Sequence, residues 1–278
     1  MNHRSLAVTF LGLLMFLWMG GCSAPGGAAD RAHGVRDGSV IKSLNADREI
    51  IGQSVLGRAI PVIRLTCEEE ATSTDVQTVL IVGGIHGNEA ASTPMLWQLI
   101  GYMKDHPDLV RGRRVVIVPA INPDGVKKGV RYNANGIDLN RNFNAKGRKN
   151  SKRYGSEGLT EPESRVLRDL VLAEMPDRII VMHQPLRCID YDGPAEKIAA
   201  FLAGYCDLPV KKLGSRPGSL GSWAGNDLKI PIITFELHRD ANKVDQLEIW
   251  KRYHRAVLAF VTYPQPLVIE EGWQQLAK

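Results

Sequence analysis

Gly83-Gly84-Ile85-His86-Gly87-Asn88-Glu89 stands directly behind the apolar run of residues 78–82. A β-branched run that ends in two glycines is typical of a buried strand that stops abruptly and turns. The histidine and the glutamate just past this turn are three residues apart, so they can contact one metal ion from two sides. A second strand-like run, residues 178–182, ends in His183. His-x-x-Glu with a distant histidine is the ligand set of a catalytic zinc site, which makes an enzyme the leading interpretation.

The alternation of strand-like and helix-like segments predicts a single α/β domain over residues 46–265. Such alternation favours a three-layer α/β/α arrangement with a mixed, mostly parallel central sheet. A flexible tether of residues 23–45 should precede the domain, and residues 266–278 should form a C-terminal tail. The chain has 278 residues, of which 44% are hydrophobic and 23% charged. This composition suffices for one sizeable core and argues against disorder of the whole chain.

The expected elements follow from apolar periodicity and from turn residues. We expect a hairpin over residues 51–63, strands over 78–82, 115–121, 178–183 and 232–237, and helices over 92–103, 161–174, 194–205 and 244–261. Thr160 should cap the second of these helices. Residues 122–125 should form a turn, residues 126–160 an ordered functional loop, and residues 184–193 an irregular segment.

The first 22 residues are predicted to be a targeting segment rather than part of the fold. Arg4 precedes an apolar run of residues 6–19 that is too short for a membrane-spanning helix. Met19-Gly20-Gly21-Cys22 resembles the lipobox of bacterial lipoproteins, in which the cysteine is acylated and becomes the first mature residue. An ordinary cleaved signal peptide is the alternative. The serine after Cys22 is similar to outer-membrane sorting signals, so we expect a lipid-anchored protein that faces the periplasm.

The remaining cysteines, Cys67, Cys188 and Cys206, permit one disulfide whose pairing the sequence does not decide. None has the spacing of a structural zinc site, and buried thiols are the alternative. The formal charge of +5 falls largely in residues 127–153. Basic tracts can attract polyanions, but no nucleic-acid motif accompanies this one. We therefore expect a solvated loop near an anionic substrate and no nucleic-acid partner.

Glu236 is the candidate general base. It lies in the apolar stretch Thr234-Phe235-Glu236-Leu237, where an unpaired carboxylate is costly. Open α/β sheets bind ligands at the carboxyl ends of their strands, so Glu236 can reach the same crevice as the histidines. A buried glutamate beside a metal-activated water can take its proton and later give it to a leaving amine. A structural salt bridge with Arg131 or Arg141 is the alternative.

The polar loop supplies candidate anion-binding groups. Arg131 and Arg141 can offer forked donors to a carboxylate or to a developing oxyanion, and Asn140 adds neutral donors. Two arginines in a polar loop can also be plain surface charges.

Five motifs in this order resemble the zinc metallocarboxypeptidases of the carboxypeptidase A type. They are His-x-x-Glu, Asn-Pro-Asp-Gly, Asp-x-Asn-Arg-Asn, a late histidine and a late Thr-x-Glu. The resemblance spans residues 50–262 and implies one zinc ion per chain, bound by His86, Glu89 and His183. It also implies that Arg131 polarises the scissile carbonyl, that Asn140 and Arg141 hold a substrate carboxylate, and that Glu236 is the base.

Within that family the chain is similar to the murein peptide amidases, which cut the bond between γ-D-glutamate and meso-diaminopimelate. The residues that carry this are Arg131-x-Asn133-x-Asn135-Gly136, Gly155-Ser156-Glu157, residues 183–189, and Pro217-Gly218-Ser219-x-Gly221-Ser222-Trp223. The chain departs from the branch at Gln184, where an aspartate is usual. It also lacks the tyrosine that larger carboxypeptidases place over the substrate terminus. Ser219, Ser222 or Trp223 are expected to line that wall.

The implied substrate, a murein peptide, carries both an ammonium group and carboxylates on its diaminopimelate residue. We expect Asp190 and Asp192 to receive the ammonium while Arg141 binds a carboxylate. The alternative for the two aspartates is that they are exposed loop acids.

Other functions remain open at the level of sequence. N-acyl amino acid deacylases of the aspartoacylase and succinylglutamate desuccinylase type share Gly-Gly-x-His-Gly-Asn-Glu and Asp-Leu-Asn-Arg. Asn-Pro-Asp-Gly and the stretch ending in Trp223 favour the peptidase. A metal-binding but inactive module that recognises murein peptides would be marked by loss of the base, yet Glu236 is present.

Overall fold

The computed structural model describes residues 44–67 and 76–268. The predicted targeting segment, Cys22 and residues 23–43 of the tether lie outside the described residues. Seven strands form one sheet: β1 Leu44–Gln53, β2 Ala59–Cys67, β3 Gln77–Val82, β4 Arg113–Val118, β5 Arg178–His183, β6 Leu186–Asp192 and β7 Ile232–His238. The main helices are α1 Ser92–Asp105, α2 Pro123–Lys128, α3 Pro162–Glu174, α4 Glu196–Ala203 and α5 Gln246–Thr262.

The strand order is β1-β2-β4-β3-β5-β7-β6. The four central strands β4, β3, β5 and β7 are parallel to one another, whereas β1, β2 and β6 add antiparallel pairings at the two sides. The predicted mixed sheet is therefore confirmed, with parallel pairing confined to its centre. Because parallel strands end at the same edge, the loops after β3, β5 and β7 meet there.

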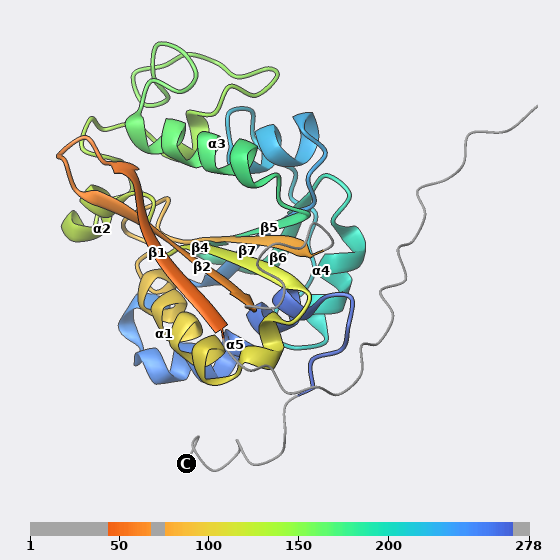
Figure 1. Ribbon diagram of the computed structural model, residues 1–278. Coiled ribbons are helices and arrows are strands. Elements are labelled where there is room, and N and C mark those ends of the chain that lie inside the picture. The colour runs from red at the N-terminus through yellow and green to blue at the C-terminus, as the bar shows by residue number, and fades with distance from the viewer. Residues whose placement is uncertain (1–43, 68–75, 269–278) are drawn as a thin grey trace, which may run out of the picture. The chain divides into compact units, whose positions relative to one another are not determined.

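Helices cover both faces of the sheet, as the ribbon shows with α3 above it and α1 and α5 below it (Figure 1). Alternate residues of β3 serve the two faces. Val79 and Ile81 pack in the core with α1, α4 and α5, while Leu80 and Val82 pack in the core with α3. A strand buried on both faces has to be apolar throughout, which explains the uninterrupted run in the sequence.

Three local expectations were wrong. Residues 122–125 do not form a simple turn. They begin helix α2, which Asn122 caps by accepting a hydrogen bond from the Gly125 N–H at 2.9 Å. Helix α3 has Glu161 rather than Thr160 at its N-cap, since the Thr160 hydroxyl accepts a hydrogen bond from Asn142. The segment after β5, expected to be irregular, forms the edge strand β6.

No disulfide joins Cys188 or Cys206 to another described cysteine. Cys188 lies buried in β6, and burial raises the pKa of its thiol to about 11. Within residues 44–67 and 76–268, we find no helix with the length and apolar character needed to cross a bilayer.

Candidate metal centre

His86, Glu89 and His183 lie together at the carboxyl edge of the sheet. Each offers one ligand atom, and these three atoms all lie within 4.8 Å of one another. The Nδ1 atoms of His86 and His183 are 2.9 and 2.8 Å from the two carboxylate oxygens of Glu89. All three residues are at least 94% buried. Two imidazole nitrogens and a carboxylate are the protein donors of a catalytic zinc site with an open position, so the residues present fit zinc.

The turn after β3 brings its two ligands into place through close backbone packing. Gly84 has a φ of +61°, in the left-handed region that favours glycine. Gly87 lies between the two ligands of this turn, and a Cβ atom there would come within 1.9 Å of the backbone of Gly125. The turn therefore packs directly on the start of α2. His183 needs no turn, because it is the last residue of β5.

Asp138 contacts the candidate metal ligand His86, and the sequence assigned it no role of its own. Its Oδ1 atom lies 3.1 Å from Nε2 of His86, on the opposite side of the ring from Glu89. Its Oδ2 atom accepts a hydrogen bond from Nε of Arg131 at 3.0 Å. A carboxylate on the far nitrogen of a metal-binding histidine fixes the ring and its tautomer. The Asp-x-Asn-Arg-Asn motif contained this residue, but only its neighbours had been given roles.

The electrostatics favour charged carboxylates around the two histidines. Burial opposes ionisation of Glu89, but His183 and His86 lower the pKa of its carboxyl below the usual range. Burial likewise opposes ionisation of Asp138, and His86 and Arg131 lower its pKa. Arg131 also donates to Glu89 at 3.3 Å. Both carboxylates are therefore ionised at neutral pH and available to the histidines and to a cation.

Glu236 lies on β7 directly opposite His183 of β5. It is 8% exposed, and its Oε2 atom accepts a hydrogen bond from the Leu186 N–H at 3.2 Å. Burial raises the pKa of its carboxyl, while nearby His183 acts in the opposite direction. Neither Arg131 nor Arg141 forms an ion pair with it among the described residues, so the structural salt bridge considered above is absent there. Glu236 is free to act on a group beside the metal ligands.

Asn140 and Arg141 border the same centre. The Asn140 amide nitrogen lies 3.3 Å from Nε2 of His183, and its amide oxygen accepts a hydrogen bond from the Leu220 N–H. The Arg141 guanidinium donates to the backbone carbonyl of Asn140. Both residues belong to the short 3₁₀ turn Leu139–Arg141, which Asp138 caps. The structure therefore places Asn140 next to His183, with Arg141 beside Asn140.

The two aspartates of β6 are buried rather than exposed. Asp190 and Asp192 are 7% and 5% exposed, and each accepts a backbone hydrogen bond, from Leu213 and Ser215 respectively. Cys188 pairs with Glu236 and Asp190 with Thr234 in the register of β6 and β7. Because side chains alternate along a strand, Asp190 lies on the same face of the sheet as Glu236.

Ser219 and Trp223 form part of the wall packed near this face. The Ser219 hydroxyl accepts a hydrogen bond from the Ser222 N–H, at the start of the π-helical segment Gly221–Asp227. Trp223 is 8% exposed and stacks on Phe143 with ring centroids 5.6 Å apart. Substrate contact by these residues stays a prediction, and their visible contacts are internal.

The chain is similar to known proteins of one enzyme family. Residues 44–185 match the zinc carboxypeptidase family. Murein peptide amidase A of Escherichia coli is 34% identical over 206 residues, which cover 68% of this chain and 80% of that protein. Murein peptide amidase A of Vibrio campbellii is 29% identical over 204 residues, covering 67% and 77%.

Solved structures agree with these matches. The crystal structure of a murein-tripeptide amidase from Escherichia coli O157 aligns with a TM-score of 0.63 at 30% identity, and covers 80% of this chain and 93% of that one. Carboxypeptidase A from Helicoverpa armigera aligns with a TM-score of 0.64 at 19% identity, covering 79% and 69%. The second likeness concerns the fold alone.

Proposed function

The chain belongs to the zinc carboxypeptidase family, and on that premise we propose that it is a zinc-dependent hydrolase of murein peptides. The observation that carries the proposal is the meeting of His86, Glu89 and His183 within 4.8 Å, with Glu236 opposite His183 on the adjacent strand. The murein peptide as substrate is supported by the identity to two murein peptide amidases. The proposed scissile bond joins γ-D-glutamate to meso-diaminopimelate.

The residues of the site have separate tasks in this reaction. Zinc, when bound, would supply a Lewis acid that lowers the pKa of water and polarises the amide carbonyl. Glu236 takes a proton from the attacking water and later gives it to the departing amino group. Arg131, held by Asp138 at 3.0 Å, donates hydrogen bonds to the oxygen that becomes negative. Asn140 and Arg141 bind a carboxylate of the substrate and so fix which amide lies beside Glu236.

Defined stem peptides provide the direct test. The zinc-loaded protein is incubated with L-Ala-γ-D-Glu-meso-diaminopimelate, and the products are identified by mass spectrometry. We expect L-Ala-D-Glu and free diaminopimelate. An N-acyl amino acid panel run in parallel tests the deacylase alternative, and cleavage of that panel alone would overturn the murein proposal. Tight binding of the peptide without any turnover would instead identify an inactive recognition module.

Asp190 is the proposed partner of the diaminopimelate ammonium group. Asp190→Asn keeps the hydrogen bond from Leu213 in reach but removes the charge. A charge-assisted hydrogen bond contributes about 1.5–3 kcal/mol, so kcat/KM for the diaminopimelate peptide should fall about 10–100-fold. The matching peptide with 2-aminopimelate, which lacks the ammonium, should be cut equally well by both proteins. Asp169→Asn on the exposed side of α3 is the control, and an equal loss on both peptides would remove Asp190 from specificity.

We further propose that Cys22 carries a lipid anchor that places the protein in the outer membrane, facing the periplasm. The support is the lipobox-like sequence Met19-Gly20-Gly21-Cys22. An anchored hydrolase would meet its substrate in the compartment that contains murein. Cys22→Ala should release the protein from the membrane fraction, and mass spectrometry should find an acylated cysteine at the mature amino terminus. An unmodified terminus at another residue would contradict the anchor.

A further inference from the structure

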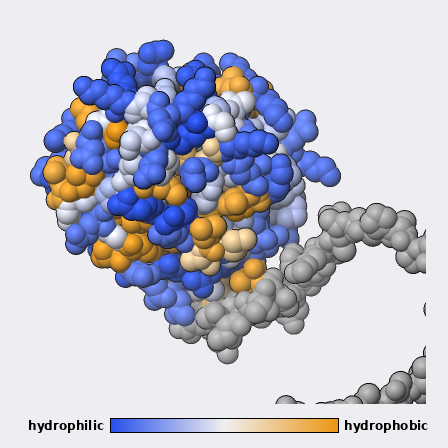
Figure 2. Space-filling model, turned by 90° about the horizontal axis from the view of Figure 1, so that it is seen from above, coloured by the Kyte–Doolittle hydropathy of each residue, from blue (hydrophilic) through white to orange (hydrophobic). Residues whose placement is uncertain are grey.

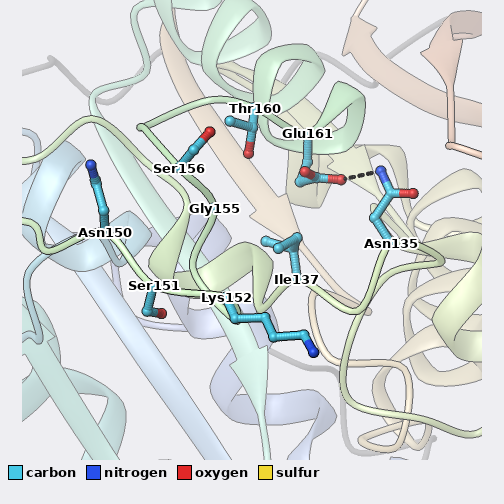
Figure 3. A pocket seen from close by; sticks show the side chains of 9 residues that line it. All are labelled: Asn135, Ile137, Asn150, Ser151, Lys152, Gly155, Ser156, Thr160 and Glu161. Carbon is cyan, nitrogen blue, oxygen red and sulfur yellow. Dashed lines mark hydrogen bonds between the residues drawn. The ribbon is translucent and has the colours of Figure 1, made fainter.

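A cavity of about 490 Å³ lies beside the loop that carries Arg131 and Asp138. It is lined by Asn135 and Ile137, by residues 150–152, 155 and 156 of the following loop, and by Thr160 and Glu161 just before α3 (Figure 3). Ile137 is bonded to Asp138, which contacts His86, so one short segment borders both the metal centre and this cavity. The cavity includes none of the metal ligands, and the reaction proposed above does not use it.

The cavity walls contain little regular secondary structure, but hydrogen bonds hold them in place. The buried Asn142 side chain donates to the carbonyl of Tyr154 at 2.8 Å and to the Thr160 hydroxyl at 2.9 Å. Arg148 donates to the carbonyls of Tyr154 and Gly155. Gly155 has a φ of +90°, and a Cβ atom there would lie 2.5 Å from the Thr160 hydroxyl. The cavity is thus preformed, which reduces the entropy that a ligand must overcome on binding.

Glu161 determines the chemistry of this cavity. It is 4% exposed, and its Oε2 atom accepts hydrogen bonds from the amides of Asn133 at 2.7 Å and Asn135 at 2.9 Å. No described residue donates to its Oε1 atom, which is left as an acceptor for a ligand hydroxyl or amide. Glu161 and Lys152 both line the cavity, so their opposite charges offset each other and the site favours neither an anion nor a cation. The ligand should be neutral and rich in hydrogen-bonding groups.

We propose that this cavity binds an N-acetylated amino sugar of the murein glycan, so that the preferred substrate is a stem peptide still attached to its sugar. The amide nitrogen of Asn150 and the hydroxyl of Ser156 border the space, and Asn135 holds Glu161 beside it (Figure 3). Ile137 offers an apolar contact for the acetyl methyl group. This inference rests on the proposed function. The sugar is attached two residues before the cleaved bond, and two extended residues span roughly 7 Å, so its site must adjoin the metal centre.

The surface around the cavity is hydrophilic, as expected for contact with a polar glycan. Seen from above, the side that carries α3 and the neighbouring loop shows mostly hydrophilic residues, with apolar residues in separate patches (Figure 2). Lys152 and Ser156 are exposed at the cavity. A hydrophilic surface of this kind suits contact with a sugar chain, whose groups are polar.

The test compares two substrates that differ only in the sugar. Disaccharide-tripeptide and sugar-free tripeptide are hydrolysed by the zinc-loaded wild type, by Ser156→Trp, which fills the cavity, and by Asn150→Ala. Glu157→Trp, which adds the same indole at an exposed position outside the cavity lining, is the matched control. The wild type should show at least about tenfold higher kcat/KM on the sugar-bearing peptide. Ser156→Trp should remove that advantage and leave the sugar-free rate unchanged, and Glu157→Trp should change neither.

Equal kcat/KM on both peptides in the wild type, or an equal loss on both in Ser156→Trp, would overturn the sugar site. A calorimetric titration with the lactyl amide of N-acetylglucosaminyl-N-acetylmuramic acid, which is uncharged like the sugar in the stem peptide, separates this outcome from failure of the proposed function. If neither peptide is cut, the proposed function is wrong, and the titration then decides on the cavity alone. Saturable binding that Ser156→Trp abolishes supports the site, and absence of binding overturns it.

Discussion

Replacing Glu236 with glutamine should lower kcat for murein-peptide hydrolysis by about 10²–10⁴-fold while zinc stays bound. Glutamine has nearly the same shape and can still accept the Leu186 N–H, so the local structure should survive. It cannot accept the proton of the attacking water, however, nor return one to the leaving amine. Because Glu236 is outside the group of His86, Glu89 and His183, its loss should leave the metal ligands intact.

Two measurements separate this role from a structural one. Metal content by plasma mass spectrometry should equal that of the wild type, and KM should change much less than kcat. Glu248→Gln, at an exposed position of α5, is the matched control and should retain full activity. Wild-type turnover by Glu236→Gln would mean that another group is the base. Loss of zinc would mean that Glu236 belongs to the metal ligands.

The site was largely predictable because its main residues stand at the ends of local patterns. An apolar run that stops at a histidine predicts both a buried strand and a polar group at the end of that strand, as at His183. The turn that contains His86 and Glu89 likewise follows a complete strand, β3. Strand direction then supplies the long-range step, since parallel strands present their carboxyl ends together. This single rule was enough to predict that residues far apart in the sequence lie together in the structure.

The sequence was less informative where the outcome depends on a distant partner. Strand β6 contains Asp190 and Asp192, which suggest a loop, but their burial is compensated by N–H groups of Leu213 and Ser215. The N-cap of α3 is Glu161 rather than the expected Thr160 for a similar reason. Asn142, 18 residues away, donates a hydrogen bond to the Thr160 hydroxyl. Such contacts are set by tertiary packing, and no local pattern encodes them.

The role of Asp138 shows a third kind of limit. A carboxylate in a polar loop has many possible partners, and only the folded chain places it 3.1 Å from His86. Its neighbours Asn140 and Arg141 were assigned through a resemblance, whereas Asp138 was present in the same motif without a role. The distance between the two side chains places Asp138 where it would orient the His86 imidazole toward a metal ion.

Replacing His183 with alanine should abolish zinc binding and, with it, hydrolysis. The change removes the Nδ1 atom that faces Glu89 at 2.8 Å and leaves two protein ligands where a catalytic zinc site uses three. Asp138→Asn should have a graded effect instead. It keeps all three ligands but weakens the support of His86, so zinc affinity should fall about 10–100-fold. The ordering wild type, Asp138→Asn, His183→Ala is thus expected both for zinc affinity and for activity at limiting zinc.

Competition with a chromogenic chelator measures these affinities, and thermal unfolding gives an independent readout. A ligand that binds only the folded state stabilises it by RT ln(1 + [L]/Kd), so added zinc should raise the Tm of the wild type strongly and that of His183→Ala hardly at all. His254→Ala, on α5 with its Nδ1 atom facing the carbonyl of Trp250, controls for loss of an imidazole elsewhere. Wild-type zinc affinity in His183→Ala would show that the three side chains do not share one ion. Activity restored to His183→Ala by excess zinc would show instead that His86 and Glu89 suffice to hold it.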